Sequence, residues 1–231
     1  MSLLNGFLTK YKNYLLKKTK CLSRRYLYEF LENNLRLITS QQGVSCVLNI
    51  GSGGQVGSRI NKFFSNSGVR IISIDIDQIR NPDLICDASN VAFKSESFDI
   101  VLCVEVLEHI FFPHECINEI HRVLKTNGNL ILTTRFIYPL HDRPNDYFRY
   151  TKYGLEKILN RFNKVIIESH LNWIETIALL IMRLLKEDYL WVKIFAGLIY
   201  FLGKLIDVSR KFTGFFKSDH IASGYMVLAK K

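Results

Sequence analysis

The sequence predicts an α/β fold built on a doubly wound, mostly parallel sheet of seven strands. Three observations lead to this prediction. Short runs such as 44–50 and 98–104 are mostly apolar, which is typical of strands buried on both faces. Segments with helical periodicity alternate with these runs. A glycine-rich turn, Gly51-Ser52-Gly53-Gly54, joins the first strand to the next helix.

The N-terminal residues 1–40 are expected to form a basic, amphipathic helical extension. Within 2–36, apolar residues such as Leu8 and Leu15 share one helical face, and most of the lysines lie opposite. The polar run 39–43 is predicted to end this region.

The core domain is predicted to span residues 41–172. Strands are expected at 44–50, 69–74, 83–86, 98–104, 129–134 and 165–169, and helices at about 56–64, 113–124 and 152–160. Proline is tolerated in the first turn of a helix, so Pro113 fits the start of the second helix. Asn127-Gly128 is predicted to be a turn before the fifth strand.

Two segments follow the predicted core. Residues 173–219 are strongly apolar and helix-prone, so they are expected to form an insertion that contacts an acceptor, a membrane or a second subunit. Residues 220–231 are expected to supply the last strand of the sheet, at 223–230. No run reaches the ~18 uncharged apolar residues that a membrane span needs.

Charge and cysteine content narrow the class of protein. The net charge is +10, but residues 37–169 are neutral, with fourteen basic and fourteen acidic residues. A basic cleft is typical of nucleic-acid enzymes, so no nucleic-acid partner is expected. The five cysteines form no C-x-x-C pair, and no metal site is expected. This cysteine usage fits a reducing, cytoplasmic compartment, and no signal peptide is expected.

Polar and acidic residues stand near the predicted strand ends. Asn49 lies just before the glycine turn, and Asp75-Ile76 follows the second strand, where a carboxylate can accept hydrogen bonds from ribose hydroxyls. Asp87-Ala88 ends the third strand, where an acid can meet an adenine amino group, and Glu105 ends the fourth. This order predicts a nucleoside cofactor at the carboxyl edge of the sheet.

Two common nucleotide motifs do not match. The nicotinamide fingerprint G-x-G-x-x-G/A needs a small third residue, and Val56 occupies that position. No G-x-x-x-x-G-K-[ST] sequence occurs, which excludes a P-loop. A nicotinamide oxidoreductase is therefore the least favoured alternative.

The ordered motifs resemble those of class I S-adenosylmethionine-dependent methyltransferases, of the kind called methyltransferase type 11. Residues 98–109 match F-D-x-V-x-x-x-x-V-L-E-H, and residues 122–130 match R-V-L-K-x-x-G-x-L. The resemblance covers 44 to about 160 and the last strand. It implies a Rossmann-like sheet, S-adenosylmethionine as cofactor and methyl transfer as the activity. The cofactor residues that it implies are Asn49, Gly51, Ser52, Gly53, Asp75, Ile76, Asp87, Ala88 and Glu105.

The sequence departs from this family at two positions. Asn49 stands where the family usually has an acid, and Gln55 stands where a third glycine is usual. These changes keep open a catalytically silent cofactor-binding scaffold. His109 belongs to the family's L-E-H run and is interpreted as structural support or as part of the site lining.

The loop 139–151 is dense in functional groups. It resembles the P-H-x-x-P-x-D-Y-x-R-[YF]-T segment of type 11 relatives, many of which are associated with cell-surface polysaccharide synthesis. A sugar hydroxyl is a weak nucleophile that needs a base. His141 is therefore predicted to be the general base, with Asp146 to orient or replace it. Asp142, Tyr147 and Arg149 are predicted to bind the acceptor, with Arg149 on an anionic group.

The predicted function is O-methylation of a glycan, nucleotide sugar or lipid-linked saccharide. A small lipophilic acceptor is an alternative that the apolar insertion favours. The basic extension and the insertion also suggest peripheral contact with an anionic membrane surface at the inner face of the membrane. Packing of the insertion in a homo-oligomer is the competing interpretation.

Overall fold

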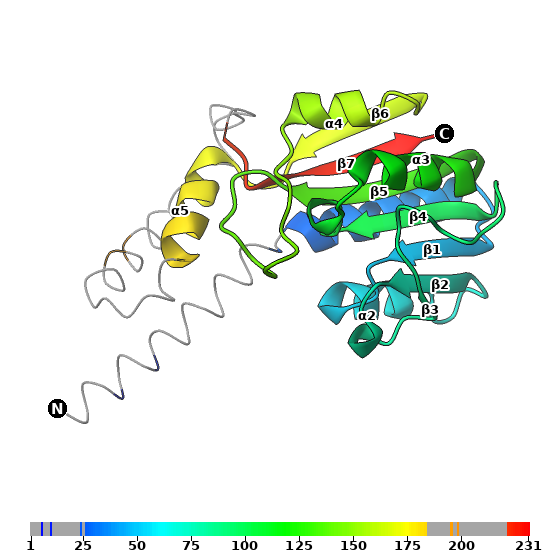
Figure 1. Ribbon diagram of the computed structural model, residues 1–231, viewed down its shortest axis with the longest axis horizontal. Coiled ribbons are helices and arrows are strands. Elements are labelled where there is room, and N and C mark those ends of the chain that lie inside the picture. Colours follow the sequence, from blue (N-terminus) through cyan, green and yellow to red (C-terminus); the bar gives the residue numbers. More distant parts are fainter. Residues whose placement is uncertain are drawn as a thin grey trace. The chain divides into compact units, whose positions relative to one another are not determined.

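The computed structural model describes residues 26–183 and 221–231, together with positions 6, 10, 24, 195 and 198. A sheet with strand order β3-β2-β1-β4-β5-β7-β6 forms its centre (Figure 1). The strands are β1 (Cys46–Ile50), β2 (Arg70–Asp75), β3 (Leu84–Ile85), β4 (Phe98–Val104), β5 (Leu124–Arg135), β6 (Lys164–Ser169) and β7 (Gly224–Lys230). The predicted α/β fold with a seven-stranded, mostly parallel sheet is confirmed.

The strand order reverses between β1 and β4. Strand β1 pairs in parallel with β2 on one side and with β4 on the other, and β4 pairs in parallel with β5. The chain therefore builds outward from β1 in one direction and then returns to build in the other. Such a switch point leaves a crevice at the carboxyl ends of the strands, where ligands bind in open α/β sheets. Strand β7 is antiparallel to β5.

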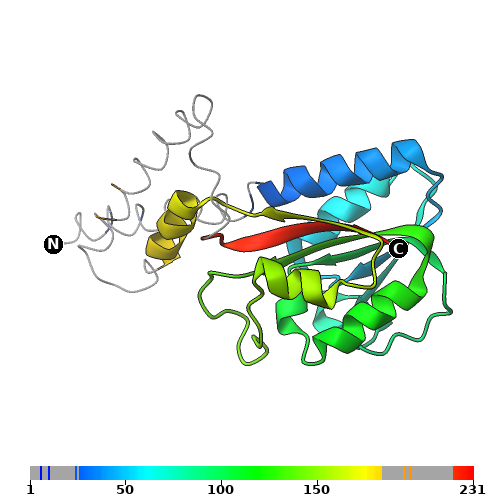
Figure 2. The ribbon, with the colours of Figure 1, turned by 90° about the horizontal axis from the view of Figure 1, so that it is seen from above.

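Helices cover both faces of the sheet. The helix at 26–41 and α2 (Gly54–Phe64) lie on one face, and α3 (Pro113–Val123) and α4 (Lys152–Ile158) lie on the other (Figure 2). Each presents one apolar stripe inward, as a surface helix does. The helices bury Leu27, Leu31 and Leu35 from 26–41, Val56, Ile60 and Phe64 from α2, and Cys116, Ile117 and Ile120 from α3.

The chain divides into two compact units. One comprises Leu27–Phe136, Leu140–Glu168 and Gly224–Lys231. This unit begins inside the predicted extension 1–40. The reason is that the helix keeps its apolar stripe from residue 27 onward, and the side chains of that stripe are buried. The helix also runs to residue 41, beyond the predicted 2–36, for the same reason. The rest of the predicted extension lies largely outside the described residues.

The second unit contains α5 (Trp173–Arg183) among its described residues. Asn172 and Glu175 begin this helix with a reciprocal cap: each side chain accepts a hydrogen bond from the other's backbone N–H, at 2.9 and 3.0 Å. Most of the predicted insertion 173–219 lies beyond the described residues. None of the described helices has the length and hydropathy of a membrane span.

Strand β5 differs from its prediction. It starts at Leu124 and includes the residues predicted as a turn, Asn127-Gly128. The register with β4 jumps from the pair Phe98 and Leu124 to the pair Ile100 and Asn129, and Asn127 has φ 64°. The turn residues are thus accommodated as a bulge inside a longer strand.

Candidate functional site

A cavity of about 260 Å³ lies at the carboxyl ends of β1 to β4, at the switch point. Six of the predicted cofactor residues line it: Gly51, Asp75, Ile76, Asp87, Ala88 and Glu105. Two predicted acceptor residues from the loop after β5, Asp142 and Tyr147, also line it. The cavity therefore brings together residues from segments that are far apart in the sequence.

Gly51 is required by the turn at the base of the cavity. Its φ is 85°, and its N–H donates to the carbonyl of Ile74 at 2.8 Å. A Cβ at position 51 would lie closer than 3.0 Å to Cγ2 of Val106, which also lines the cavity. Only glycine combines this backbone conformation with this close approach.

Gly57, one position after Val56, allows α2 to pack closely on the glycine turn. A Cβ at position 57 would lie closer than 3.0 Å to the carbonyl oxygen of Ser52. The first turn of α2 therefore packs directly on the glycine turn, with Gly53 as the N-cap residue. The residue was overlooked because it falls one position beyond the expected spacing.

Asp75 is almost fully buried and anchors the turn. Its carboxylate accepts hydrogen bonds from the backbone N–H groups of Ser52 and Asp77, both at 3.0 Å. Nη1 of Arg80 lies 3.7 Å from the same carboxylate. Asp77 and Arg80 line the cavity although no sequence motif identified them. Their only sequence signal is proximity to the end of β2.

Glu105 is held on the cavity wall by β5. It has φ 58°, accepts a hydrogen bond from Oγ1 of Thr133 at 3.0 Å, and pairs with Arg135. Asp87 is exposed and accepts a hydrogen bond from Ser89 N–H at 2.8 Å. Asn49 is buried and does not line the cavity. Glu105 thus faces the cavity, whereas Asn49 does not.

Asp146 and Arg149 stabilise the loop after β5. The guanidinium of Arg149 donates to both carboxylate oxygens of Asp146, at 2.6 and 2.7 Å. Asp146 is buried and also accepts a hydrogen bond from His141 N–H at 2.9 Å. These contacts, that with Arg149 above all, hold the pKa of Asp146 well below its usual range. Arg149 is therefore engaged with Asp146 rather than directed at the cavity, and neither residue lines it.

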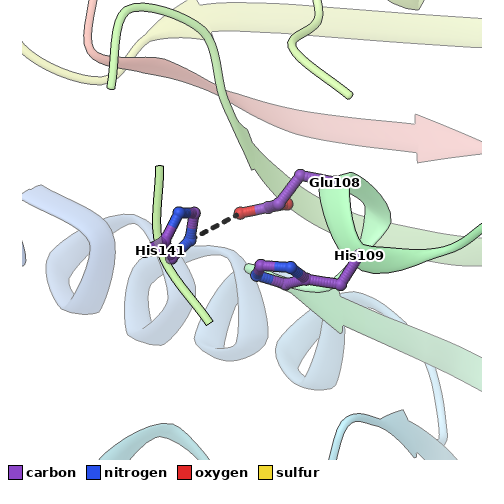
Figure 3. Close-up of side chains that lie close together, drawn as sticks. All are labelled: Glu108, His109 and His141. Atoms are coloured by element: carbon purple, nitrogen blue, oxygen red, sulfur yellow. Dashed lines mark ion pairs between the residues drawn. The ribbon is translucent and has the colours of Figure 1, made fainter. Parts of the chain in front are cut away.

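The loop is tied to the 3₁₀ helix η2 (Leu107–His109) that follows β4. The backbone N–H groups of Tyr147 and Phe148 donate to the carbonyl of Glu108, at 3.0 and 3.2 Å. This closure places His141 beside Glu108 and His109 (Figure 3). His109 lines the cavity and His141 does not, and the centroids of their two rings lie 4.7 Å apart.

Glu108 is a fully buried carboxyl group in this corner. Its Oε2 accepts a hydrogen bond from Oγ1 of Thr134 at 2.8 Å, and its Oε1 lies 3.9 Å from Nε2 of His141. Burial raises the pKa of Glu108 to about 8, and the charge of Glu105 adds to the increase. Burial also lowers the pKa of His141, as does nearby His109, while Asp146 opposes the change. The sequence alone did not indicate that Glu108 and His141 meet.

Comparison with known proteins agrees with this geometry. Residues 48–132 match the family model described as "Methyltransferase domain". Over 89 residues the chain is 32% identical to the ubiquinone biosynthesis O-methyltransferase of Pseudomonas syringae pv. tomato; the match covers 38% of this chain and 33% of that protein. The curated relatives are thus matched over only about a quarter to a third of their own lengths.

Solved structures share the fold. A S-adenosylmethionine-dependent methyltransferase from Archaeoglobus fulgidus superposes with a TM-score of 0.55 at 17% identity, covering 88% of this chain and 94% of that one. The cyclase SpnF superposes with the same TM-score at 16% identity, covering 87% of this chain and 81% of that one. These comparisons establish the class I methyltransferase fold and support a methyltransferase domain in this chain.

Proposed function

We infer that this chain is an S-adenosylmethionine-dependent methyltransferase that methylates a hydroxyl group of a saccharide acceptor. One observation carries the inference: Gly51, Asp75, Asp87 and Glu105 line the same cavity. Each of them stands at the end of a different strand, from β1 to β4, as the family motifs require. The match of residues 48–132 to a methyltransferase domain supports the same reading.

We assign the cofactor's parts to the strand ends. Asp75 would accept hydrogen bonds from the ribose hydroxyls, because its carboxylate lines the cavity and a strand-end acid is suited to this contact. Asp87-Ala88 would lie at the adenine, and Ile76 would pack on it. The turn formed by Gly51, Ser52 and Gly53 would approach the methionine portion closely, since glycine leaves the backbone accessible. Asn49 would support the turn from behind.

The acceptor is proposed to enter beside the loop after β5. In methyl transfer, a bond forms between the acceptor oxygen and the methyl carbon while the bond from that carbon to sulfur breaks, and the electron pair stays on sulfur. The main task of the protein is therefore to align donor and acceptor. Asp142 and Tyr147 line the cavity and are proposed to contact the acceptor.

His141 is proposed to activate the acceptor hydroxyl as a general base. Asp146 accepts a hydrogen bond from the backbone N–H of His141 and pairs with Arg149. These contacts support a role for Asp146 and Arg149 in positioning His141. This differs from the prediction that Arg149 binds an anionic group of the acceptor, because its guanidinium is already engaged. His109, on the cavity wall, joins His141 as a candidate for contact with the acceptor.

The two flanking segments, 1–40 and 173–219, are proposed to bring the protein to its acceptor by contact with the acceptor itself, a membrane or a second copy of the chain. The apolar stretch 173–219 would contact a lipid-linked saccharide, the anionic inner face of a membrane or a second copy of the chain. The basic residues of 1–40 would add to the membrane contact. Most of both segments lies outside the described residues, so their composition is the support for this part of the proposal.

One observation favours a second candidate, a methyltransferase for a small lipophilic acceptor. Three aromatic side chains, Phe111, Phe112 and Tyr147, are exposed beside one another, and two of them line the cavity. Aromatic surfaces accept both sugar rings and planar apolar rings. A catalytically silent scaffold that binds the cofactor is the alternative from another class, and the departures from the family pattern at Asn49 and Gln55 are its support.

The proposal is tested by calorimetry with S-adenosylmethionine, followed by turnover assays. Nucleotide sugars, lipid-linked saccharides and quinone-like phenols would be offered as acceptors, and S-adenosylhomocysteine formation would be measured. Turnover with a saccharide is expected, and turnover with phenols alone would favour the second candidate. Cofactor binding without turnover on any acceptor would favour the scaffold, and no cofactor binding would refute the proposal.

Two variants test the loop assignments. His141→Ala is expected to lower turnover by about 10²-fold or more with cofactor affinity unchanged, since a general base contributes about that much. Asp146→Asn is expected to lower it less, because Asp146 acts through the position of His141. His114→Ala, on the exposed side of α3, is the control. A loss of less than a few-fold in both loop variants would contradict the assignment.

A further inference from the structure

Three side chains converge where the loop after β5 meets η2. Glu108, His109 and His141 each offer one metal-ligating atom, and these atoms lie within 4.8 Å of one another. Glu108 and His109 come from η2, while His141 comes from the loop, and all three point toward a common space (Figure 3). Two imidazoles and one carboxylate form a common ligand set for divalent transition metals.

The carboxylate of Glu108 is incompletely satisfied. Its Oε2 is held by Thr134, but its Oε1 has no hydrogen-bond partner among the described residues. The side chain is completely buried. A buried acceptor without a donor costs about 1–3 kcal/mol, so its retention calls for a ligand or another explanation. Oε1 is directed at His141, on the side where the other two ligand atoms lie.

His109 is held in an orientation suited to metal binding. Its Nδ1 lies 2.6 Å from the carbonyl oxygen of Asn145, a distance at which Nδ1–H donates to the carbonyl. The lone pair of the neutral ring is then on Nε2. Metal-ligating histidines commonly use this arrangement, in which a backbone carbonyl fixes the tautomer and the ring orientation. Oδ2 of Asp142 lies 4.0 Å from Nε2 of His109 and offers a fourth ligand atom.

We propose that Glu108, His109 and His141 bind a divalent transition-metal ion such as Zn²⁺ or Mn²⁺ at the edge of the cofactor cavity. Ligand bonds of about 2.0–2.2 Å place neighbouring ligand atoms roughly 3–3.6 Å apart. The three atoms therefore need to approach one another by about 1–2 Å from their present limit of 4.8 Å. Rotation of the partly buried imidazole of His141, with His109 kept in place by Asn145, supplies a movement of this size.

The ion's role rests on the proposed function, although its binding does not. His109 lines the cavity, so an ion on its ring would bind the acceptor's hydroxyl oxygen from the cavity wall. Coordination would lower the pKa of that hydroxyl, and its proton would pass to solvent water. The oxygen would then form its bond to the methyl carbon as the carbon–sulfur bond breaks, the electron pair staying on sulfur and S-adenosylhomocysteine leaving. His141 then acts as a ligand, and the metal replaces the imidazole in activating the acceptor.

The experiment is titration of the chelator-treated full-length protein with Co²⁺, followed by calorimetry and by visible absorption. One strongly bound Co²⁺ per chain with ligand-field bands is expected. Glu108→Gln keeps the volume and the bond to Thr134 but removes the charge, and His141→Ala removes a nitrogen. Each is expected to weaken Co²⁺ binding by about tenfold or more. His114→Ala, which removes an exposed histidine, is expected to bind as the wild type does.

Circular dichroism and S-adenosylmethionine binding show whether each variant is folded. If Glu108→Gln is unfolded, His141→Asn takes its place. No stoichiometric binding by the wild type, or unchanged bands and affinity in folded variants, would overturn the proposal. Metal binding without any methyl transfer would leave the site standing and refute the proposed function. Methyl transfer that survives chelation, in a protein that binds no Co²⁺, would support the proposed function and refute the metal site.

Discussion

Replacing the glycines of the turn should separate two physical effects. Gly54 has φ 73°, and a Cβ there would meet nothing within 4 Å, so Gly54→Ala introduces backbone strain alone. Gly57 has an ordinary φ, but its Cβ would lie closer than 3.0 Å to the carbonyl of Ser52. Gly51 combines both effects, with φ 85° and the side chain of Val106 in the way. The three alanine variants therefore form a matched series.

The magnitudes follow from these contacts. A left-handed backbone costs a non-glycine residue about 1–2 kcal/mol, which is the expected destabilisation for Gly54→Ala. Overpacking adds about 1–3 kcal/mol. Gly51→Ala is therefore expected to lower the free energy of unfolding by about 2–5 kcal/mol. Because Val106 lines the cavity, its displacement should also weaken S-adenosylmethionine binding by about tenfold or more, which corresponds to ~1.4 kcal/mol.

Urea denaturation measures the unfolding free energies, and calorimetry with S-adenosylmethionine measures the affinities. Gly43→Ala is the control, since its Cβ would meet nothing within 4 Å and its φ is ordinary. Gly54→Ala should lose stability and keep most of its affinity. The reasoning fails if Gly51→Ala is no less stable than Gly54→Ala, or if it binds the cofactor as tightly as the wild type.

Three further predictions concern carboxylates. Asp75→Asn is expected to raise the Kd for S-adenosylmethionine by about 10- to 100-fold, since hydrogen bonds to a charged group contribute about 1.5–3 kcal/mol; an unchanged calorimetric Kd would contradict the ribose assignment. Asp146→Asn should destabilise the protein by about 2–4 kcal/mol in urea, because it removes the buried carboxylate that accepts both hydrogen bonds from Arg149, and an unshifted midpoint would exclude this. Burial would raise the pKa of Asp99, but hydrogen bonds from Lys125, and from Ser45 and Cys46, outweigh it and lower the pKa from 3.8 to about 2. Since the folded pKa lies below the unfolded one, this carboxylate stabilises the protein by about 2 kcal/mol above pH 5 and loses that contribution as the pH falls through 3.8 toward 2. Urea curves of the wild type and Asp99→Asn should therefore differ at pH 7 and converge near pH 2, and a constant difference would refute the linkage.

Much of the fold and of the cofactor wall could be predicted from local patterns. Mostly apolar runs identified β1 and β4, and the residues just after them identified Gly51 and Glu105, which line the cavity. Such predictions succeed because the carboxyl ends of parallel strands meet at one edge of a sheet whatever their separation in sequence. The β5 bulge was missed because Asn127-Gly128 has the composition of a turn in either setting.

The side-chain contacts around Glu108, His109 and His141 could not be predicted in this way. His141 is prominent in a polar loop, but nothing local indicates that its ring lies next to Glu108 or that Arg149 is bound to Asp146. Those facts depend on how the loop closes on η2 through the backbone of Tyr147. A loop's path is set by such long-range contacts, which leave no periodic signal along the chain.

The order of strands, glycine turn and acids along the sequence therefore predicted which class of fold forms and which strand-end residues line the cavity at the carboxyl edge of the sheet. Periodicity and strand-end position are local properties, and the parallel sheet converts them into one site. The pairing of buried charges followed from three-dimensional packing alone. Burial makes an unpaired charge costly, so each group takes the partner that folding brings within reach. Glu108, His109 and His141 lie together because the loop closes on η2, which the spacing of residues along the chain does not reveal.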